Sequence, residues 1–255
     1  MTSPSFAVLE RHLLIHRRVW TSTALTSLCV PLLFLLSLGV GVGGRIGSVD
    51  GVPYKAWIAV PLLASTAFQQ AAQESTFRLF NDLNTTRVID AMATTPAGVR
   101  AIVLGRLLFI VVRVGAGAVG FLVIAGLFGG IRSWWIVAAP PVVVALTAAT
   151  ALPLTALTSV IKDDTYMPAV SRFVTIPLVL LSGIFFSIAN APGWVRPVVY
   201  ASPLWHGVEL IRGAALGHAP EWPVWAHLAV LAAWSALGYF LAAKVLNRRL
   251  YDGRN

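Results

Sequence analysis

The chain has 255 residues, of which 57% are hydrophobic and only 11% are charged, and its formal net charge is +9. Soluble globular domains carry about 25% charged residues, so this composition excludes an ordinary soluble protein and indicates an integral membrane protein. Most basic residues flank apolar segments, as is typical of membrane proteins, so the positive charge predicts no nucleic-acid partner. The single cysteine, Cys29, excludes an intrachain disulfide.

The N-terminal residues 1–20 are predicted to hold an amphipathic helix, Ser5–Arg18, that lies along the inner membrane surface. Phe6, Leu9 and Leu13 recur near helical spacing, with charged residues between them. Such a helix buries its apolar face at the membrane interface and turns its cations toward anionic headgroups. Membrane lipids are therefore one predicted partner of the chain.

The first two membrane spans follow, at about Thr21–Val42 and Tyr54–Gln73. The inner end of the second span carries four polar residues on one helical face, which must face protein or water rather than lipid. Interhelical hydrogen bonding and a place in a transport path both explain this face, and both interpretations stay open. The four residues are Gln69, Gln70, Gln73 and Glu74.

The longest polar stretch, residues 75–100, is predicted to be cytoplasmic and to contain one short helix, Thr85–Ala93. Asn84 is the predicted N-cap of this helix, and Thr95 and Pro96 end it. A helix this short is marginal alone and needs a surface to dock against. Its small apolar face consists of Val88, Ile89 and Met92.

Four further spans are predicted from apolar stretches long enough to cross a bilayer: Ala101–Gly130, Ile136–Ile161, Pro168–Ile188 and Trp222–Leu246. The first of these four contains Arg113. An intramembrane arginine either has a function there or extends its charge to the inner surface, and the sequence does not separate the two interpretations.

Residues 189–221 stay apolar between the last two spans, but Pro192, Pro197 and Pro203 break them into pieces too short to cross a bilayer. Short helical pieces at membrane depth need protein or a water-filled cavity around their backbone ends. We therefore expect a re-entrant or interfacial helical hairpin in this region.

The distribution of basic residues predicts the orientation. With Arg113 left out, thirteen Lys and Arg residues fall on the side of the two termini and five on the other side. Because cytoplasmic loops are enriched in basic residues, the termini and the Thr85–Ala93 helix are predicted to be cytoplasmic and the hairpin external. The predicted fold is an all-α integral membrane protein, a single domain over residues 1–255 with six spans.

Two segments carry a resemblance to a known family. They are TTPAGVRAIVLGRLL, Thr94–Leu108, and LSGIFFSIANAPGWVRPVVYASPLWHGVELIRG, which begins at Leu181. Together with the layout of nearly the whole chain, they resemble the permease subunit of type-2 ABC exporters. The tail PLWHGVELIRG is most similar to the lipo-oligosaccharide exporters of the nodulation type, and daunorubicin-resistance permeases share the layout. The chain departs from the family pattern at Ser187 and Ile188, where a phenylalanine-proline pair is frequent.

The resemblance implies an exporter in the inner (plasma) membrane that moves a hydrophobic or amphipathic substrate, such as a drug, a lipid or a lipid-linked glycan. It also implies two copies of an ATPase subunit and a second permease, the same or a homologous chain, as partners. The Thr85–Ala93 helix is then the coupling helix, seated in a groove of the ATPase. Its predicted contact residues are Asn84, Thr86, Arg87, Val88, Ile89, Asp90 and Met92.

The sequence assigns ATP chemistry to the partner. A P-loop needs G-x-x-x-x-G-K-[ST], and no Gly-Lys pair occurs in the chain. ATP and Mg are therefore expected on the ATPase, and no cofactor, metal site or catalytic residue is expected in this chain. Two other classes stay as alternatives: an intramembrane enzyme acting on lipids, for which no nucleophile motif is recognised, and an ion channel or secondary transporter, for which no internal repeat is found.

Two sets of side chains are candidates for the transport mechanism. The predicted substrate pathway, in spans that line the permease interface of the family, consists of Gln69, Gln70, Gln73, Ser182, Phe185 and Phe186. Structural or gating roles are predicted for Glu74, Arg113, His206, Glu209 and Arg212. Residues three apart on a helix lie on one side of it, so Glu209 and Arg212 can pair and fix the hairpin. Proton chemistry is the alternative role for this group.

Overall fold

The computed structural model is mostly helical and describes most of the chain. The first predicted span, Thr21–Val42, lies almost entirely outside the described residues. The described residues are 4–17, 29, 32–33, 36–37, 41, 47–49, 51–127, 129, 131–188 and 191–251.

The helices follow one another with few strands between them, and π-helical turns (η2, η3, η5) and one 3-10 turn (η4) extend several of them. In chain order the elements are α1 Pro4–His16, β1 Ser48–Val49, β2 Val52–Pro53, α4 Tyr54–Ala59, α5 Pro61–Gln73, η2 Glu74–Arg78, η3 Asn81–Thr85, α6 Val88–Ala93, α7 Gly98–Leu127, η4 Trp134–Ala138, α8 Ala139–Val160, α9 Tyr166–Val170, η5 Ser171–Thr175, α10 Ile176–Leu181, α11 Arg196–Ala201, α12 Pro203–Leu216 and α13 Val224–Tyr251.

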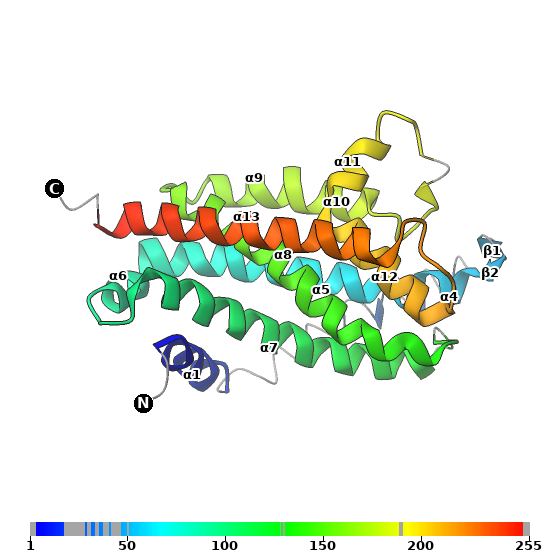
Figure 1. Cartoon of the computed structure of the whole chain (residues 1–255), viewed down its shortest axis with the longest axis horizontal. Coiled ribbons are helices and arrows are strands. Elements are labelled where there is room, and N and C mark those ends of the chain that lie inside the picture. Colours follow the sequence, from blue (N-terminus) through cyan, green and yellow to red (C-terminus); the bar gives the residue numbers. More distant parts are fainter. Residues whose placement is uncertain are drawn as a thin grey trace.

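Three long helices, α7, α8 and α13, run along the long axis of the molecule (Figure 1). The helix α8 packs against α5, α7, α12 and α13 and so lies at the centre of the bundle. Within the described part of the chain, three helices are long and apolar enough to cross a membrane: Gly98–Leu127, Trp134–Val160 and Val224–Tyr251. They stand at the places of the third, fourth and sixth predicted spans. The total of six spans stays a prediction, because the apolar helix at the place of the fifth, Tyr166–Leu181, is shorter.

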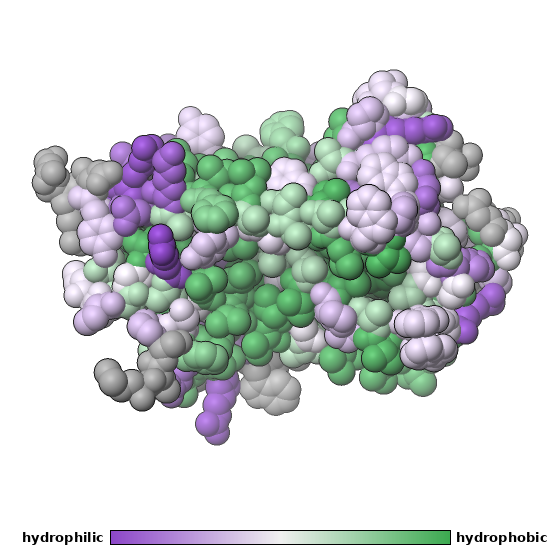
Figure 2. All heavy atoms as spheres, in the orientation of Figure 1, coloured by the Kyte–Doolittle hydropathy of each residue, from purple (hydrophilic) through white to green (hydrophobic). Residues whose placement is uncertain are grey.

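On the face seen in Figure 2, an apolar band crosses the middle of the molecule and hydrophilic side chains gather toward its two ends. Large hydrophobic side chains stay exposed on the long helices, among them Val119 and Val123 of α7 and Leu237 and Phe240 of α13. A protein in water rarely exposes so continuous an apolar surface, whereas a membrane protein presents it to lipid. The fold is therefore that of a helical membrane protein.

The second helix is longer than the predicted span Tyr54–Gln73. Its backbone stays helical through Val60, which joins α4 to α5, and continues past Gln73 through η2 and η3 to Thr85. The polar residues that ended the span in the sequence are paired here, since Glu74 and Asp82 contact arginines of α7. Hydropathy contains no information about ion pairs between helices. The predicted span therefore ended at Gln73, whereas the helix continues to Thr85.

The predicted N-cap at Asn84 is wrong. Asn84 lies within η3, where its Nδ2 donates a hydrogen bond to the Phe80 carbonyl at 3.1 Å. The residue before α6 is Arg87, which has a left-handed φ of 50° and makes no side-chain cap. Asparagine caps a helix where the chain enters it from an extended conformation. Here η3 continues to Thr85 and the capping position falls at Arg87, three residues after Asn84, so Asn84 cannot cap α6.

Two glycines allow the closest helix contacts. A Cβ atom on Gly238 of α13 would lie 2.5 Å from Cδ of Pro153 in α8. A Cβ atom on Gly105 of α7 would lie 2.6 Å from Cβ of Val8 in α1. Because real Cβ contacts are longer than this, only glycine permits both contacts in this geometry.

Two short helices, α11 and α12, occupy the region predicted as a hairpin, at the end of the molecule opposite α6 (Figure 1). Pro197 and Pro203 lie in the first turns of α11 and α12, where a helix needs no N–H donor from its own residues. Ser202 caps α12 by accepting a hydrogen bond from the Leu204 N–H at 3.2 Å. The prolines therefore begin new helices at this end of the molecule.

Candidate functional site

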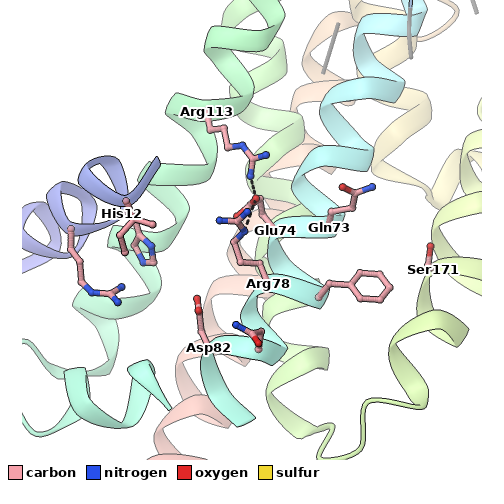
Figure 3. A pocket seen from close by; sticks show the side chains of 11 residues that line it. His12, Gln73, Glu74, Arg78, Asp82, Arg113 and Ser171 are labelled. Atoms are coloured by element: carbon pink, nitrogen blue, oxygen red, sulfur yellow. Dashed lines mark ion pairs between the residues drawn. The ribbon is translucent and has the colours of Figure 1, made fainter. Parts of the chain in front are cut away.

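A pocket of about 550 Å³ opens beside α1, toward the α6 end of the molecule. Figure 3 shows it between α1 on one side, the η2 and η3 turns in the middle and Ser171 of η5 on the far side. Its wall is mixed, because Ile15 and Phe77 contribute apolar surface next to ionised side chains. The charged residues of the wall are Arg11, Arg78, Arg113, Glu74 and Asp82.

Glu74 is the centre of this pocket. Its side chain is only 5% exposed, and two arginines are directed toward it in Figure 3. Arg78, one helical turn further along, places Nε 3.2 Å from Glu74 Oε1, and Arg113 of α7 forms an ion pair with the same oxygen. A buried carboxylate is stable only when paired, so the two guanidinium groups explain why a charge is tolerated here.

Asp82 forms the second ion pair, with Arg106 of α7. Arg106 also donates a hydrogen bond from Nη2 to the backbone carbonyl of Glu74 at 3.2 Å, so one side chain of α7 contacts both the Asp82 carboxylate and the backbone at Glu74. Arg106 and Arg113 are seven residues apart on α7, and Glu74 and Asp82 are eight apart on the facing helix. Spacings near two turns put each pair on one helical face, so the two faces meet as a ladder of opposite charges.

The α1 side of the pocket is formed by His12. Its ring stacks on Phe109 of α7, with 5.1 Å between the ring centroids, and the residue is almost fully buried. Burial and, to a smaller extent, the positive charge of Arg106 together lower the pKa of His12 to about 4, although Asp82 acts in the opposite direction. The imidazole is therefore neutral at neutral pH, and it packs as an aromatic surface.

The structure gathers only part of the predicted pathway at this pocket. Gln73 lines it, whereas Gln69 donates to Ser65 Oγ at 3.0 Å, and Gln70 lies beside Gly117 of α7. Glu74 and Arg113, which were predicted to have structural or gating roles, line it as well.

Sequence reasoning missed four residues of this cluster: Arg11, Arg78, Asp82 and Arg106. The signal that points to Arg78, Asp82 and Arg106 is the matched spacing of acidic and basic residues on two consecutive helices, and it does not extend to Arg11 of α1. That signal is visible only once the second helix is known to extend past Gln73, because Asp82 otherwise falls in a loop.

The short helix α6 lies at the same end of the molecule and is held firmly. Arg249 of α13 donates from Nη2 to Asn84 Oδ1 at 2.6 Å and from Nη1 to the carbonyls of Ser159 and Ile161. Tyr251 Oη donates to the Ala93 carbonyl at 3.1 Å. These bonds connect both ends of the α6 segment to the last long helix.

The predicted contact residues of α6 divide into two groups. Ile89 is fully buried in a cluster with Leu83 and Ile102, so it anchors the helix to the protein and is not available to a partner. The others reach the surface to some degree: Thr86 and Arg87 are exposed, and Asn84, Val88, Asp90 and Met92 are half-buried.

The remaining predicted residues lie at the opposite end. Arg212 Nη1 is 2.6 Å from Glu209 Oε1, and its guanidinium lies 4.0 Å from the ring centroid of Trp57. His206 does not join this pair, because its Nδ1 lies 2.8 Å from Nδ1 of His227. The side chain of Arg212 also donates to the Gly183 carbonyl, so it ties α12 to the segment after α10.

The aromatic residues after α10 are packed to different degrees. Phe185 packs against the main core, Phe186 is partly exposed, and Ser182 donates from Oγ to the Val179 carbonyl at 2.7 Å. Across the residues that the structure describes, no group of three or more His, Cys, Asp or Glu side chains is arranged to hold a metal ion.

The long apolar helices and the ion-paired pocket at one end define a multi-helix membrane protein with polar groups placed beside its membrane-embedded core. Comparison with known proteins gives the family. The family model described as ABC-2 type transporter matches residues 5–216, and the chain belongs to that family of membrane transport permeases.

Individual relatives match nearly the whole chain. Nodulation protein J of Rhizobium meliloti (strain 1021) is 29% identical over 244 residues, which cover 96% of this chain and 93% of the relative. Nodulation protein J of Rhizobium leguminosarum bv. trifolii is 28% identical over 244 residues, with the same coverage. The inner membrane transport permease YadH of Escherichia coli (strain K12) is 26% identical over 219 residues, or 80% of each chain.

Proposed function

We propose that this chain is the membrane-spanning subunit of an ATP-driven exporter in the inner membrane, with both termini in the cytoplasm. It works with two copies of a separate ATPase subunit and with a second permease, the same or a homologous chain. Family membership supports the transport role, and the lack of a P-loop in the sequence puts ATP hydrolysis on the partner.

The observation that carries the proposal is the attachment of α6. Arg87 and Thr86 are exposed on one side of this segment, while Ile89 fixes its other side to the protein. Arg249 and Tyr251 tie the segment to α13, and η3 joins it to the second helix. A push on α6 from a partner would therefore pass directly into two long helices, which is what a coupling helix needs to do.

The proposed cargo is a hydrophobic or amphipathic molecule, a drug, a lipid or a lipid-linked glycan, taken from the cytoplasm or the inner leaflet. The resemblance to nodulation-type lipo-oligosaccharide exporters and the relatives named nodulation protein J favour the lipid-linked glycan. ATPase activity of the reconstituted complex, measured with each of the three substrate classes, tests this choice. Stimulation by the lipid-linked glycan is expected to be the strongest.

The coupling role is tested by charge introduced on α6. Val88→Asp and Met92→Asp each put a carboxylate on the half-buried side of the helix, and Arg87→Glu reverses an exposed charge. We expect at least tenfold less ATPase subunit to co-purify with these variants, because an unpaired charge in an interface is costly. Arg248→Gln, an exposed change on α13 at the same end, is the matched control. Variants that assemble and transport like the unaltered protein would show that α6 is not the coupling helix.

A further inference from the structure

The pocket beside α1 holds more positive than negative charge. Its two carboxylates, Glu74 and Asp82, are met by Arg78, Arg106 and Arg113, and Arg11 lines the pocket from α1. The pocket wall itself has three guanidinium groups and two carboxylates, and Arg106, which pairs with Asp82 without lining the pocket, raises the excess to two positive charges. Within the described part of the chain, Arg11 makes no ion pair. An excess of this kind at the edge of a low-dielectric region attracts an anion.

Polar atoms in the same pocket also lack partners. His12 is 7% exposed, and its Nε2 has no hydrogen-bond partner among the described residues, nor has Oε2 of Glu74, whose side chain is 5% exposed. Buried polar atoms are normally satisfied, so these atoms indicate a place where a ligand completes the hydrogen bonding. A neutral imidazole N–H suits an anionic oxygen, and a free carboxylate oxygen suits a hydroxyl group.

The pocket is also apolar enough for a molecule with a hydrocarbon tail. Ile15 and Phe77 line it with exposed side chains, and Leu14 beside them on α1 is exposed as well. The pocket lies beside α1 and the η2 and η3 turns (Figure 3), toward the end of the molecule that carries α6. A volume of about 550 Å³ accommodates a headgroup together with the start of its chains.

We propose that this pocket binds the anionic headgroup of a membrane amphiphile, with Arg11 and Arg78 contacting a phosphate-like group and Ile15 and Phe77 contacting the first part of its acyl chain. Arginine suits this role because its planar fork of donors matches phosphate oxygens in two-bond contacts. This inference depends on the proposed function in one respect only: export across the membrane gives the direction in which the bound amphiphile is later moved. Binding itself requires no ATPase.

The test is native mass spectrometry of the full-length permease in detergent, titrated with phosphatidylglycerol, phosphatidylcholine and soluble glycerol phosphate. We expect one phosphatidylglycerol to bind with saturation, and the other two to bind at least tenfold more weakly. Added salt is expected to weaken phosphatidylglycerol binding, because part of the attraction is electrostatic. If glycerol phosphate binds as tightly as phosphatidylglycerol, the pocket binds a free anion and the proposal of a membrane amphiphile is wrong. If phosphatidylcholine and phosphatidylglycerol bind equally, the pocket does not select an anionic headgroup and the proposal is wrong as well.

Substitutions place the binding in this pocket. Arg11→Gln removes a charge without breaking an internal ion pair of the described residues and is expected to raise the Kd for phosphatidylglycerol about tenfold. Arg11→Gln with Arg78→Gln is expected to raise it further, whereas Arg11→Lys keeps the charge and most of the affinity. Arg248→Gln, exposed at the same end, is the control and should leave the Kd within about twofold. An unchanged Kd in the double variant overturns the proposal. Loss of α6 coupling would leave this binding intact, so the two proposals fail separately.

Discussion

Glu74 holds a negative charge with very little contact to solvent, and its charge balance depends on Arg113. Replacing Arg113 by Met would leave the carboxylate with only Arg78, whose side chain is 45% exposed. Breaking a buried ion pair on one side costs about 3 kcal/mol. We therefore expect Arg113→Met to lower the free energy of unfolding by roughly that amount, measured by thermal or denaturant unfolding of the purified protein.

The matched variant is Glu74→Gln together with Arg113→Met. Removing both charges leaves no uncompensated ion, so the double variant is expected to lose less stability than Arg113→Met alone. If the loss of stability in the double variant equals the sum of the losses in Glu74→Gln and Arg113→Met, the two residues are not coupled and Arg113 is stabilised by other groups.

His12 makes the docking of α1 sensitive to acid. Its pKa is about 4 in the folded protein and 6.5 when exposed, so the undocked helix binds more protons at intermediate pH. By linkage, the stabilisation of the docked state is complete above pH 6.5 and is lost as the pH falls toward 4. We expect hydrogen-exchange protection of α1, corrected for intrinsic rates, to fall about twentyfold between pH 7 and pH 5.

The control for this effect is His12→Phe, which keeps an aromatic ring against Phe109 and cannot be protonated. Its α1 protection should change little over the same pH range. Burial also lowers the pKa of His16, so protonation of His16 contributes to the acid sensitivity of α1. The variant His16→Gln measures the part of the pH dependence of α1 protection that His16 causes. Equal acid sensitivity of His12→Phe and the unaltered protein would assign the effect to groups other than His12.

At the scale of the element, the contact between α1 and α7 depends on Gly105. A side chain there would meet Cβ of Val8 at 2.6 Å and the Ser5 carbonyl oxygen at 2.7 Å, and a backbone atom cannot turn aside. Gly105→Ala is therefore expected to displace α1 and to cost about 1–3 kcal/mol, seen as a lower melting temperature and weaker α1 protection.

Gly115→Ala is the control on the same helix, because nothing lies within 4 Å of its added Cβ atom. Alanine is the better helix former, so this change should leave the stability unchanged or raise it by about 0.5–1 kcal/mol. If both alanine variants behave alike, α1 does not dock on α7 through Gly105.

The elements that could be predicted from the sequence are those whose signal lies within one helix. Long apolar runs predicted Ala101–Gly130 and Trp222–Leu246, and the helices are Gly98–Leu127 and Val224–Tyr251. The extension of the second helix to Thr85 could not be predicted in this way. Its polar residues are stabilised by arginines of α7, and a window of hydropathy contains no information about a neighbouring helix.

The residues of the candidate site also divide into those that the sequence indicates by themselves and those that only the contacts between helices reveal. Glu74 and Arg113 could be singled out because an ionised residue at membrane depth is unusual in any sequence. Arg11 and His12 could not, since they belong to an interfacial helix in which charged and apolar residues alternate in any case. Their place in the pocket follows from the docking of α1 on Phe109, a contact between residues about one hundred positions apart.

At the scale of the whole molecule, polarity is distributed along one axis. Helices α6 and α1 lie at one end of the molecule, and α11 and α12 lie at the other (Figure 1). The pocket is lined by residues of α1, and the pair Glu209–Arg212 belongs to α12. An apolar band separates the two ends (Figure 2). The proposed coupling helix and the proposed amphiphile site therefore lie at the same end of the molecule, and the proposed ATP-driven movement of α6 would act on the end where the amphiphile is proposed to bind.

This arrangement predicts which loops face the cytoplasm. In a Cys29→Ser background, single cysteines are placed at exposed positions of each end: Thr94→Cys after α6, Asp164→Cys between α8 and α9, and His218→Cys after α12. Because basic residues are enriched at the α6 end, that end is expected inside. A membrane-impermeant maleimide should label His218→Cys in intact cells, and Thr94→Cys and Asp164→Cys only after permeabilisation. The reverse pattern would place α6 outside the cell, where a cytoplasmic ATPase cannot reach it. Labelling of Thr94→Cys and Asp164→Cys from opposite sides of the membrane would contradict the structure, in which the loop after α8 and the residues after α6 lie at the same end of the molecule (Figure 1).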